Sequence, residues 1–118
     1  MRTRAMELGW RGEEAVRRWL ERRGFTFVER NFRTRYGEID LIMKDGDVLV
    51  FIEVKTRTSR SFGAPEESIS DRKMERMEAA VAQYVQRHVV CGSYRIDLAV
   101  CEWTDWREGW NIRYTRNI

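Results

Sequence analysis

The sequence has few of the residues that build compact metal or redox sites. It contains two cysteines, Cys91 and Cys101, and one histidine, His88. The cysteines lack the C-x-x-C spacing of zinc ligands and one histidine cannot form a cluster, so we expect no structural zinc site. No apolar run reaches the length of a membrane span, and the charged N-terminus lacks the apolar core of a signal peptide. We therefore expect a cytoplasmic protein with reduced thiols and no membrane partner.

Proline is equally scarce, and no linker or low-complexity tract divides the chain. The single proline, Pro65, lies in a polar stretch, residues 58–67, that we expect to be a loop. A chain of 118 residues is long enough to bury one hydrophobic core. We expect a single domain over residues 1–118.

The basic residues are unusual in kind rather than in number. The formal net charge is only +3, yet all but three of the 22 basic residues are arginine. Arginine binds phosphate through paired hydrogen bonds, so nucleic acid is a natural partner, although genome composition or heat adaptation also enriches arginine. Trp103, Trp106 and Trp110 either cover an edge of the core or form an aromatic surface for bases.

The chain is organised around residues 36–57, which read YGEIDLIMKDGDVLVFIEVKTR. Alternating apolar residues, a turn at residues 45–47 and a nearly continuous apolar run predict two antiparallel strands. The second strand is apolar enough to be covered on both faces, yet it ends in Glu53 and Lys55. The period of two places these side chains on one face, across the hairpin from Asp40. Unpaired buried charge is costly, and a divalent metal would compensate it.

Two amphipathic helices are expected on either side of this hairpin in the sequence. The first covers residues 6–23, with Glu13 on its inner face, and the second runs from Ser70 to about His88. Lys73, in the first turn of the second helix, either leans toward the charged residues of the hairpin or extends along apolar surface. Further strands are expected at residues 25–32, 94–101 and 110–114.

The order helix, three strands, helix, strand resembles the restriction-endonuclease-like fold. The specific match is to the PD-(D/E)xK nuclease signature, with Asp40 followed after 13 residues by Glu53-x-Lys55 and with the proline of the signature absent. The resemblance implies an α/β fold with a central mixed sheet of four to five strands flanked by helices, in the order αβββαβ. Archaeal Holliday-junction resolvases of this superfamily are similar in size, in the Asp-to-Glu spacing and in having a first-helix glutamate.

A wider pattern of short segments extends over nearly the whole chain. Its members are Gly12-Glu13, Asn31-Phe32-Arg33, Tyr36-Gly37-Glu38-Ile39-Asp40-Leu41, Phe51-Ile52-Glu53-Val54-Lys55-Thr56-Arg57, Phe62-Gly63, Lys73 and Arg95-Ile96-Asp97. This pattern resembles the bacterial YraN family of small uncharacterised proteins. Membership of that family implies a nuclease-like fold rather than a known substrate.

The chemistry of phosphodiester hydrolysis fits the charged residues of the hairpin. Asp40 and Glu53, with the Val54 carbonyl, are expected to hold Mg²⁺ or Mn²⁺, since hard cations take oxygen ligands. Lys55 would orient or deprotonate the attacking water and stabilise developing charge. Glu13 would bind a second metal or a metal-bound water, or else it is a boundary residue that pairs with an arginine. Phosphate contacts are expected from a basic set, namely Arg33, Arg35, Arg57, Arg60 and Lys73.

Three classes of function stay open at this point. The first is a metal-dependent endonuclease acting on double-stranded, branched or damaged DNA, with a homodimer as its expected form. The second is a nucleic-acid-binding module with the same fold and little turnover. The third is a protein-interaction module in which Asp40, Glu53 and Lys55 form a structural ion-pair centre.

Overall fold

The computed structural model describes residues 3–58, 69–88, 90, 92–105 and 109–118. The expected loop is outside this range except for Thr58, which ends a strand. The elements follow in the order α1 (Arg4–Glu21), β1 (Thr26–Arg33), β2 (Glu38–Asp45), β3 (Val48–Thr58), α2 (Asp71–His88), β4 (Tyr94–Asp105) and β5 (Gly109–Thr115).

The strands form one mixed sheet in the order β1-β2-β3-β4-β5. β1, β2 and β3 pair antiparallel, β3 and β4 pair parallel, and β5 returns antiparallel to β4. The parallel pair needs a long crossover connection, which contains α2. The restriction-endonuclease-like α/β fold expected from the sequence is confirmed, and β5 extends the αβββαβ core at one edge.

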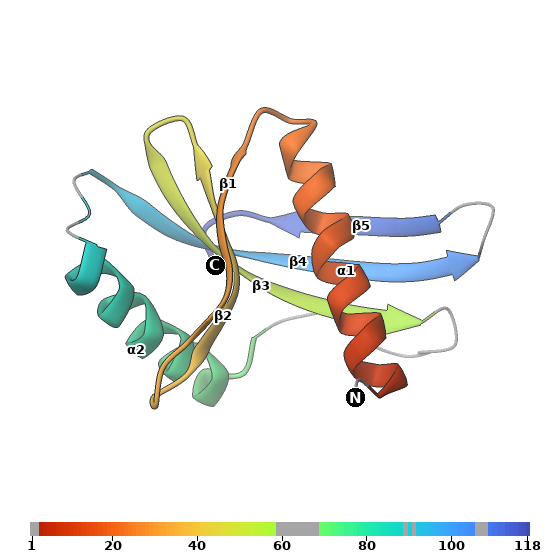
Figure 1. Cartoon of the computed structure of the whole chain (residues 1–118), viewed down its shortest axis with the longest axis horizontal. Helices are drawn as coiled ribbons and strands as arrows, with labels where there is room; N and C mark the ends of the chain where they lie inside the picture. The colour runs from red at the N-terminus through yellow and green to blue at the C-terminus, as the bar shows by residue number, and fades with distance from the viewer. Residues whose placement is uncertain (1–2, 59–68, 89, 91, 106–108) are drawn as a thin grey trace.

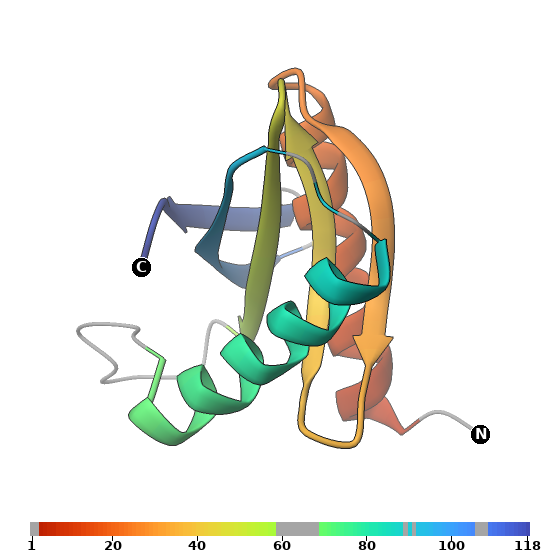
Figure 2. The same cartoon turned by 90° about the vertical axis from the view of Figure 1, so that its left-hand side faces the viewer.

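The two helices cover opposite faces of the sheet (Figures 1 and 2). α1 packs against β3 and β4, whereas α2 packs mainly against β2. Each face has its own apolar cluster because the strands alternate their side chains between the two faces. Val16, Leu20, Leu41, Val50 and Ile52 are central on the α1 side. Phe32, Ile42, Phe51, Met77 and Tyr84 are central on the α2 side.

Local signals explain where each helix begins. Thr3 caps α1, since its hydroxyl accepts the Met6 amide at 3.1 Å, so the helix starts two residues before the expected position. Ser70 caps α2 as expected, and its hydroxyl accepts the Lys73 amide at 3.2 Å. No helix in the described ranges is both long and apolar enough to cross a membrane.

Two glycines allow the elements near the hairpin to approach closely. A Cβ added to Gly12 of α1 would lie 2.5 Å from the Thr56 hydroxyl of β3. A Cβ added to Gly37, in the turn between β1 and β2, would lie 2.3 Å from the backbone carbonyl oxygen of Arg76 in α2. These close approaches bring the middle of α1 and the first half of α2 against the hairpin and the turn before it.

Candidate active site

The two central carboxylates meet where the β2–β3 pairing ends. The paired residues run from Asp45 opposite Val48 to Leu41 opposite Ile52, and one further step places Asp40 opposite Glu53. The Val54 amide just beyond this point donates to Asp40 Oδ2 at 2.9 Å. Glu53 is only 4% exposed, and its carboxyl group hydrogen-bonds that of Asp40.

When no cation is bound, this contact requires that the two carboxyl groups share a proton. Burial is the largest cause that raises the pKa of Asp40, to about 9, and the hydrogen bond and charge of Glu53 add to it. The Val54 amide opposes the shift, and Glu13 contributes a small further repulsion. Two adjacent carboxylates cannot both ionise at low cost unless a cation balances them. A pair of buried carboxylate oxygens fits a hard divalent cation that retains part of its water shell.

Lys73 supplies one positive charge at this centre. Its ammonium group lies 3.3 Å from Glu53 Oε2, although the lysine side chain itself is 44% exposed. Burial alone would lower the pKa of Lys73, but the charge and hydrogen bond of Glu53 outweigh it, and the pKa is raised. Of the two roles open to Lys73, the structure shows the one in which it leans toward the charged residues of the hairpin.

Glu13 lies near Asp40 and pairs with an arginine, which is one of the two roles that the sequence left open for it. It lines one pocket with Asn31, Glu38 and Asp40. Arg30 Nη2 donates to Glu13 at 2.9 Å, and burial still raises the pKa of Glu13 because desolvation outweighs this pairing.

Glu14 accepts the other arm of the same guanidinium at 2.9 Å. Among the described residues, no three acidic, histidine or cysteine side chains gather into a metal-binding cluster. The role of Glu13 as a ligand therefore stays a prediction. No signal in the sequence paired Arg30 of β1 with Glu13 and Glu14 of α1.

Lys55 follows Glu53 by two residues within β3, and the regular register with β4 continues through both. Strand alternation therefore turns the two side chains to the same face of the sheet. The Val54 carbonyl, which the sequence suggests as a ligand, belongs to the same strand segment, and its role stays a prediction.

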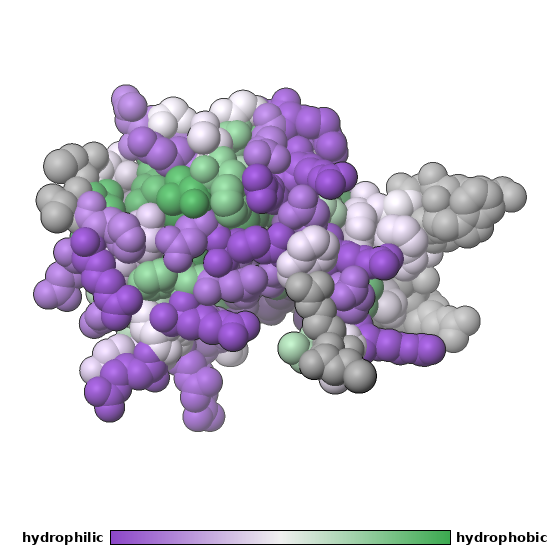
Figure 3. Space-filling view, viewed as in Figure 1, coloured by the Kyte–Doolittle hydropathy of each residue, from purple (hydrophilic) through white to green (hydrophobic). Residues whose placement is uncertain are grey.

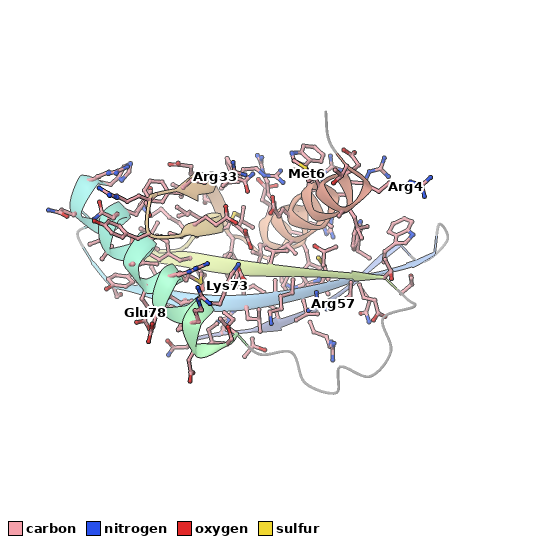
Figure 4. All side chains as sticks on the ribbon, turned by 90° about the horizontal axis from the view of Figure 1, so that it is seen from below. Arg4, Met6, Arg33, Arg57, Lys73 and Glu78 are labelled. Carbon is pink, nitrogen blue, oxygen red and sulfur yellow. The ribbon has the colours of Figure 1, made fainter. Side chains whose placement is uncertain are left out.

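The expected phosphate-binding residues fall into two groups. Arg33, Arg35 and Lys73 line a single pocket between the β1–β2 turn and α2. Arg76, which the sequence interpretation omitted, lines it as well, and its position one turn after Lys73 was the available signal. Arg57 lies farther along β3, on the other side of that strand from Arg33 (Figure 4). Arg60 lies outside the described residues.

Comparison with known proteins identifies the family. The model of the uncharacterised protein family UPF0102 matches residues 12–101. This chain belongs to UPF0102. The resemblance to the YraN family noted from the sequence is thereby confirmed. The matched part of this chain extends from the middle of α1 through most of β4, so it includes Asp40, Glu53, Lys55 and Lys73.

Curated UPF0102 proteins from diverse bacteria are similar to this chain. One from Syntrophomonas wolfei is 46% identical over 80 residues, covering 68% of this chain and 70% of its own. One from Anaeromyxobacter dehalogenans is 47% identical over 81 residues, covering 69% and 60%. One from Herminiimonas arsenicoxydans is 36% identical over 104 residues, covering 88% and 84%. Membership of UPF0102 assigns no reaction, so function is argued from the site.

Proposed function

We propose that this protein is a metal-dependent endonuclease that hydrolyses phosphodiester bonds in DNA. The observation that carries the proposal is the contact between Asp40 and the buried Glu53, where burial, together with the hydrogen bond and charge of Glu53, raises the pKa of Asp40 to about 9. A structural centre of this kind would be more stable with a neutral side chain in place of one carboxyl group. A site that binds Mg²⁺ or Mn²⁺ needs both carboxylates.

The side chains around the pair divide the work of hydrolysis. Asp40 and Glu53 would hold the cation, with the Val54 amide orienting Asp40. A divalent cation bound there would supply positive charge to the scissile phosphate and lower the pKa of a bound water. Lys55 would orient the attacking water and stabilise the negative charge that develops on the phosphate oxygens. Glu13 would add negative charge on the other side of Asp40.

The basic residues on the flank of α2 would position the nucleic acid. Arg33, Arg35, Lys73 and Arg76 line one pocket beside the carboxylates. Contacts of this kind bind the phosphate backbone without reading sequence. Double-stranded or branched DNA is the partner that we propose for this surface, with Arg57 and Arg60 as further phosphate contacts.

One observation favours a second candidate, a nucleic-acid-binding module without turnover. Lys73 already lies 3.3 Å from Glu53, and a proton on Asp40 would complete the neutralisation of the pair without a metal. A cleavage assay separates the two candidates. Linear duplex, single-stranded, flap and four-way-junction DNA would be incubated with Mg²⁺ and with Mn²⁺, using wild type and Asp40→Asn. Metal-dependent cleavage lost in the variant supports the endonuclease.

Two further variants separate catalysis from binding. Lys55→Ala should lower single-turnover cleavage by about 10²-fold or more while changing DNA affinity little, because Lys55 acts on one phosphate. Arg57→Ala should weaken binding to all sequences alike and reduce the salt slope by about one unit. Equal losses of binding in both variants, without a separate loss of turnover, would contradict the role given to Lys55.

A further inference from the structure

The tryptophans of the described residues gather at one place, although they are far apart in the sequence. A groove between the outer side of α1 and the β4–β5 hairpin is lined by Trp10, Trp19, Trp103 and Trp110. We refer to it as the tryptophan groove. The fifth tryptophan, Trp106, lies outside the described ranges. Packing into the core is not enough to explain why the four tryptophans lie together, since none of their indoles is fully buried.

The indoles keep exposed surface while their neighbours hold them in place. Trp103 and Trp110 lie opposite each other in the β4–β5 register, with ring centroids 5.2 Å apart. Trp19 packs against Tyr114, with ring centroids 5.6 Å apart, and Trp10 is 38% exposed. Rings that are fixed yet partly exposed are suited to stacking on another flat group.

The same groove is basic. Arg11 and Arg18 of α1 and Arg22, the C-cap of this helix, line it together with one acidic residue, Glu14. The outward side of α1 is mostly hydrophilic (Figure 3). Arg11 and Arg18 form ion pairs with glutamates one turn earlier in α1, and their own side chains are 65% and 69% exposed. Exposed pairs of this kind contribute little, so these guanidinium groups can turn to a phosphate at small cost.

The tryptophan groove leads to the candidate active site. Trp10 lines both the groove and the neighbouring pocket that contains Glu13 and Asp40. The basic pocket with Arg76 adjoins the site on the side of α2, whereas the tryptophan groove adjoins it on the side of α1. A ligand in the groove would therefore continue toward the carboxylates.

We propose that the tryptophan groove binds a single-stranded stretch of polynucleotide, with bases stacked on the indoles and phosphates on the arginines. Aromatic platforms beside basic side chains are how proteins bind single strands without sequence preference, whereas the bases of an intact duplex are stacked on each other and not available. This inference rests on the proposed function, and it narrows the substrate class to nucleic acid in which a single strand adjoins the cleaved bond. An apolar peptide or a second copy of this basic chain would not supply the negative charge that three arginines favour.

The test measures binding of a fluorescent oligothymidylate of about 12 nucleotides by anisotropy in EDTA, where no cleavage takes place. Arg18→Gln is compared with Arg17→Gln, a matched change at the preceding position of α1 that does not line the groove. Trp10→Ala is compared with Trp10→Phe, which keeps an aromatic ring. Intrinsic tryptophan fluorescence reports contact with the groove directly, and circular dichroism verifies that each variant is folded.

We expect Arg18→Gln and Trp10→Ala each to weaken oligothymidylate binding about five-fold or more, while Arg17→Gln and Trp10→Phe stay within two-fold of wild type. Wild-type fluorescence should be quenched on binding. Equal effects of Arg17→Gln and Arg18→Gln, or binding without quenching, would overturn the inference. Concentration-dependent self-association that Trp10→Ala abolishes, with oligothymidylate binding intact, would instead assign the groove to a second copy. Failure of the proposed function is distinguishable, because it would appear as absent cleavage while oligothymidylate still binds.

Discussion

Replacing Asp40 with asparagine removes a charge from the candidate site without changing its shape. The amide oxygen of asparagine can still accept the hydrogen bond from the Val54 amide, which Asp40 receives at 2.9 Å. Its amide nitrogen can donate to Glu53, as the protonated carboxyl group of Asp40 does. The variant therefore reproduces the protonated state of Asp40 at every pH, and the difference from wild type measures what that proton costs.

The sign and size of the effect follow from the pKa of Asp40. The native state keeps the proton up to about pH 9. The unfolded chain releases it near pH 4, so wild-type stability falls as the pH rises between these values. The slope is at most about 1.4 kcal/mol per pH unit, and the accumulated loss at pH 7 is at most about 4 kcal/mol. Lys73 and local rearrangement reduce it, so we expect Asp40→Asn to be more stable than wild type at pH 7 by about 1–3 kcal/mol.

Urea unfolding of both proteins between pH 4.5 and pH 8.5, in EDTA, measures this difference. The two stability curves should meet near the acidic end and separate as the pH rises. Added Mg²⁺ should then stabilise wild type by mass action, by about 1.4 kcal/mol at ten times the dissociation constant, and should leave Asp40→Asn unchanged. A wild-type curve parallel to that of the variant would refute the protonated carboxylate pair.

Asp97→Asn provides the matched control at a second aspartate of the sheet. Asp97 is fully buried. Its carboxylate accepts hydrogen bonds from the Arg95 guanidinium at 3.0 Å, from the Asn117 backbone amide at 2.8 Å and from the Tyr114 hydroxyl. Removing its charge leaves Arg95 with Asp45, 3.1 Å away, as its remaining counter-ion and takes away the fully buried one, so the free energy of unfolding should fall by about 3 kcal/mol. The same chemical change is thus expected to stabilise at Asp40 and destabilise at Asp97. Stabilisation at both positions would mean that the variants report on something other than local charge.

Two further substitutions test the contacts around the site. Gly37→Ala would place a Cβ 2.3 Å from the Arg76 carbonyl oxygen, so the turn must move away from α2, and urea unfolding should show a loss of about 1–3 kcal/mol. An unchanged midpoint would show that this approach is not tight. Lys73→Met removes the ammonium group 3.3 Å from Glu53, so thermal unfolding in EDTA should occur a few degrees lower and the Mg²⁺-induced rise should increase. A smaller Mg²⁺ effect in this variant would mean that Lys73 assists metal binding rather than competing with it.

Most of the fold could be predicted because it depends on local patterns. The alternation across residues 38–45 and 48–58 and the Ser70 cap located the hairpin and the start of α2 within a residue or two. The start of α1 was shifted by two residues, because Thr3 caps the helix and its role is not visible without the backbone geometry, and the helix ends at Glu21, two residues before the expected end. β4 continues four residues past its expected end at Cys101, because its pairing with β5 extends it.

The candidate site was predicted only in part. Strand alternation predicted that Glu53 and Lys55 share a face and that Asp40 lies across the hairpin, and the strand registers agree, since a period of two needs no information from elsewhere in the chain. The catalytic roles of these residues stay predictions. The partners of these charges were harder to find. Arg30 binds Glu13, and an ion pair between a strand and a helix depends on how the two elements pack.

The sequence by itself therefore determined the order of the elements, the faces of the strands and the residues that carry charge at the end of the hairpin. Only the tertiary structure decided that Asp40 and Glu53 share a buried contact and that Lys73 lies beside it. It also decided that tryptophans from both ends of the chain line one groove next to α1. The physical reason is the distance along the chain over which each interaction acts. Backbone periodicity depends on neighbouring residues only. The energy of a buried charge and the contact between distant rings depend on distances of a few ångströms, which are set by how the helices pack on the sheet.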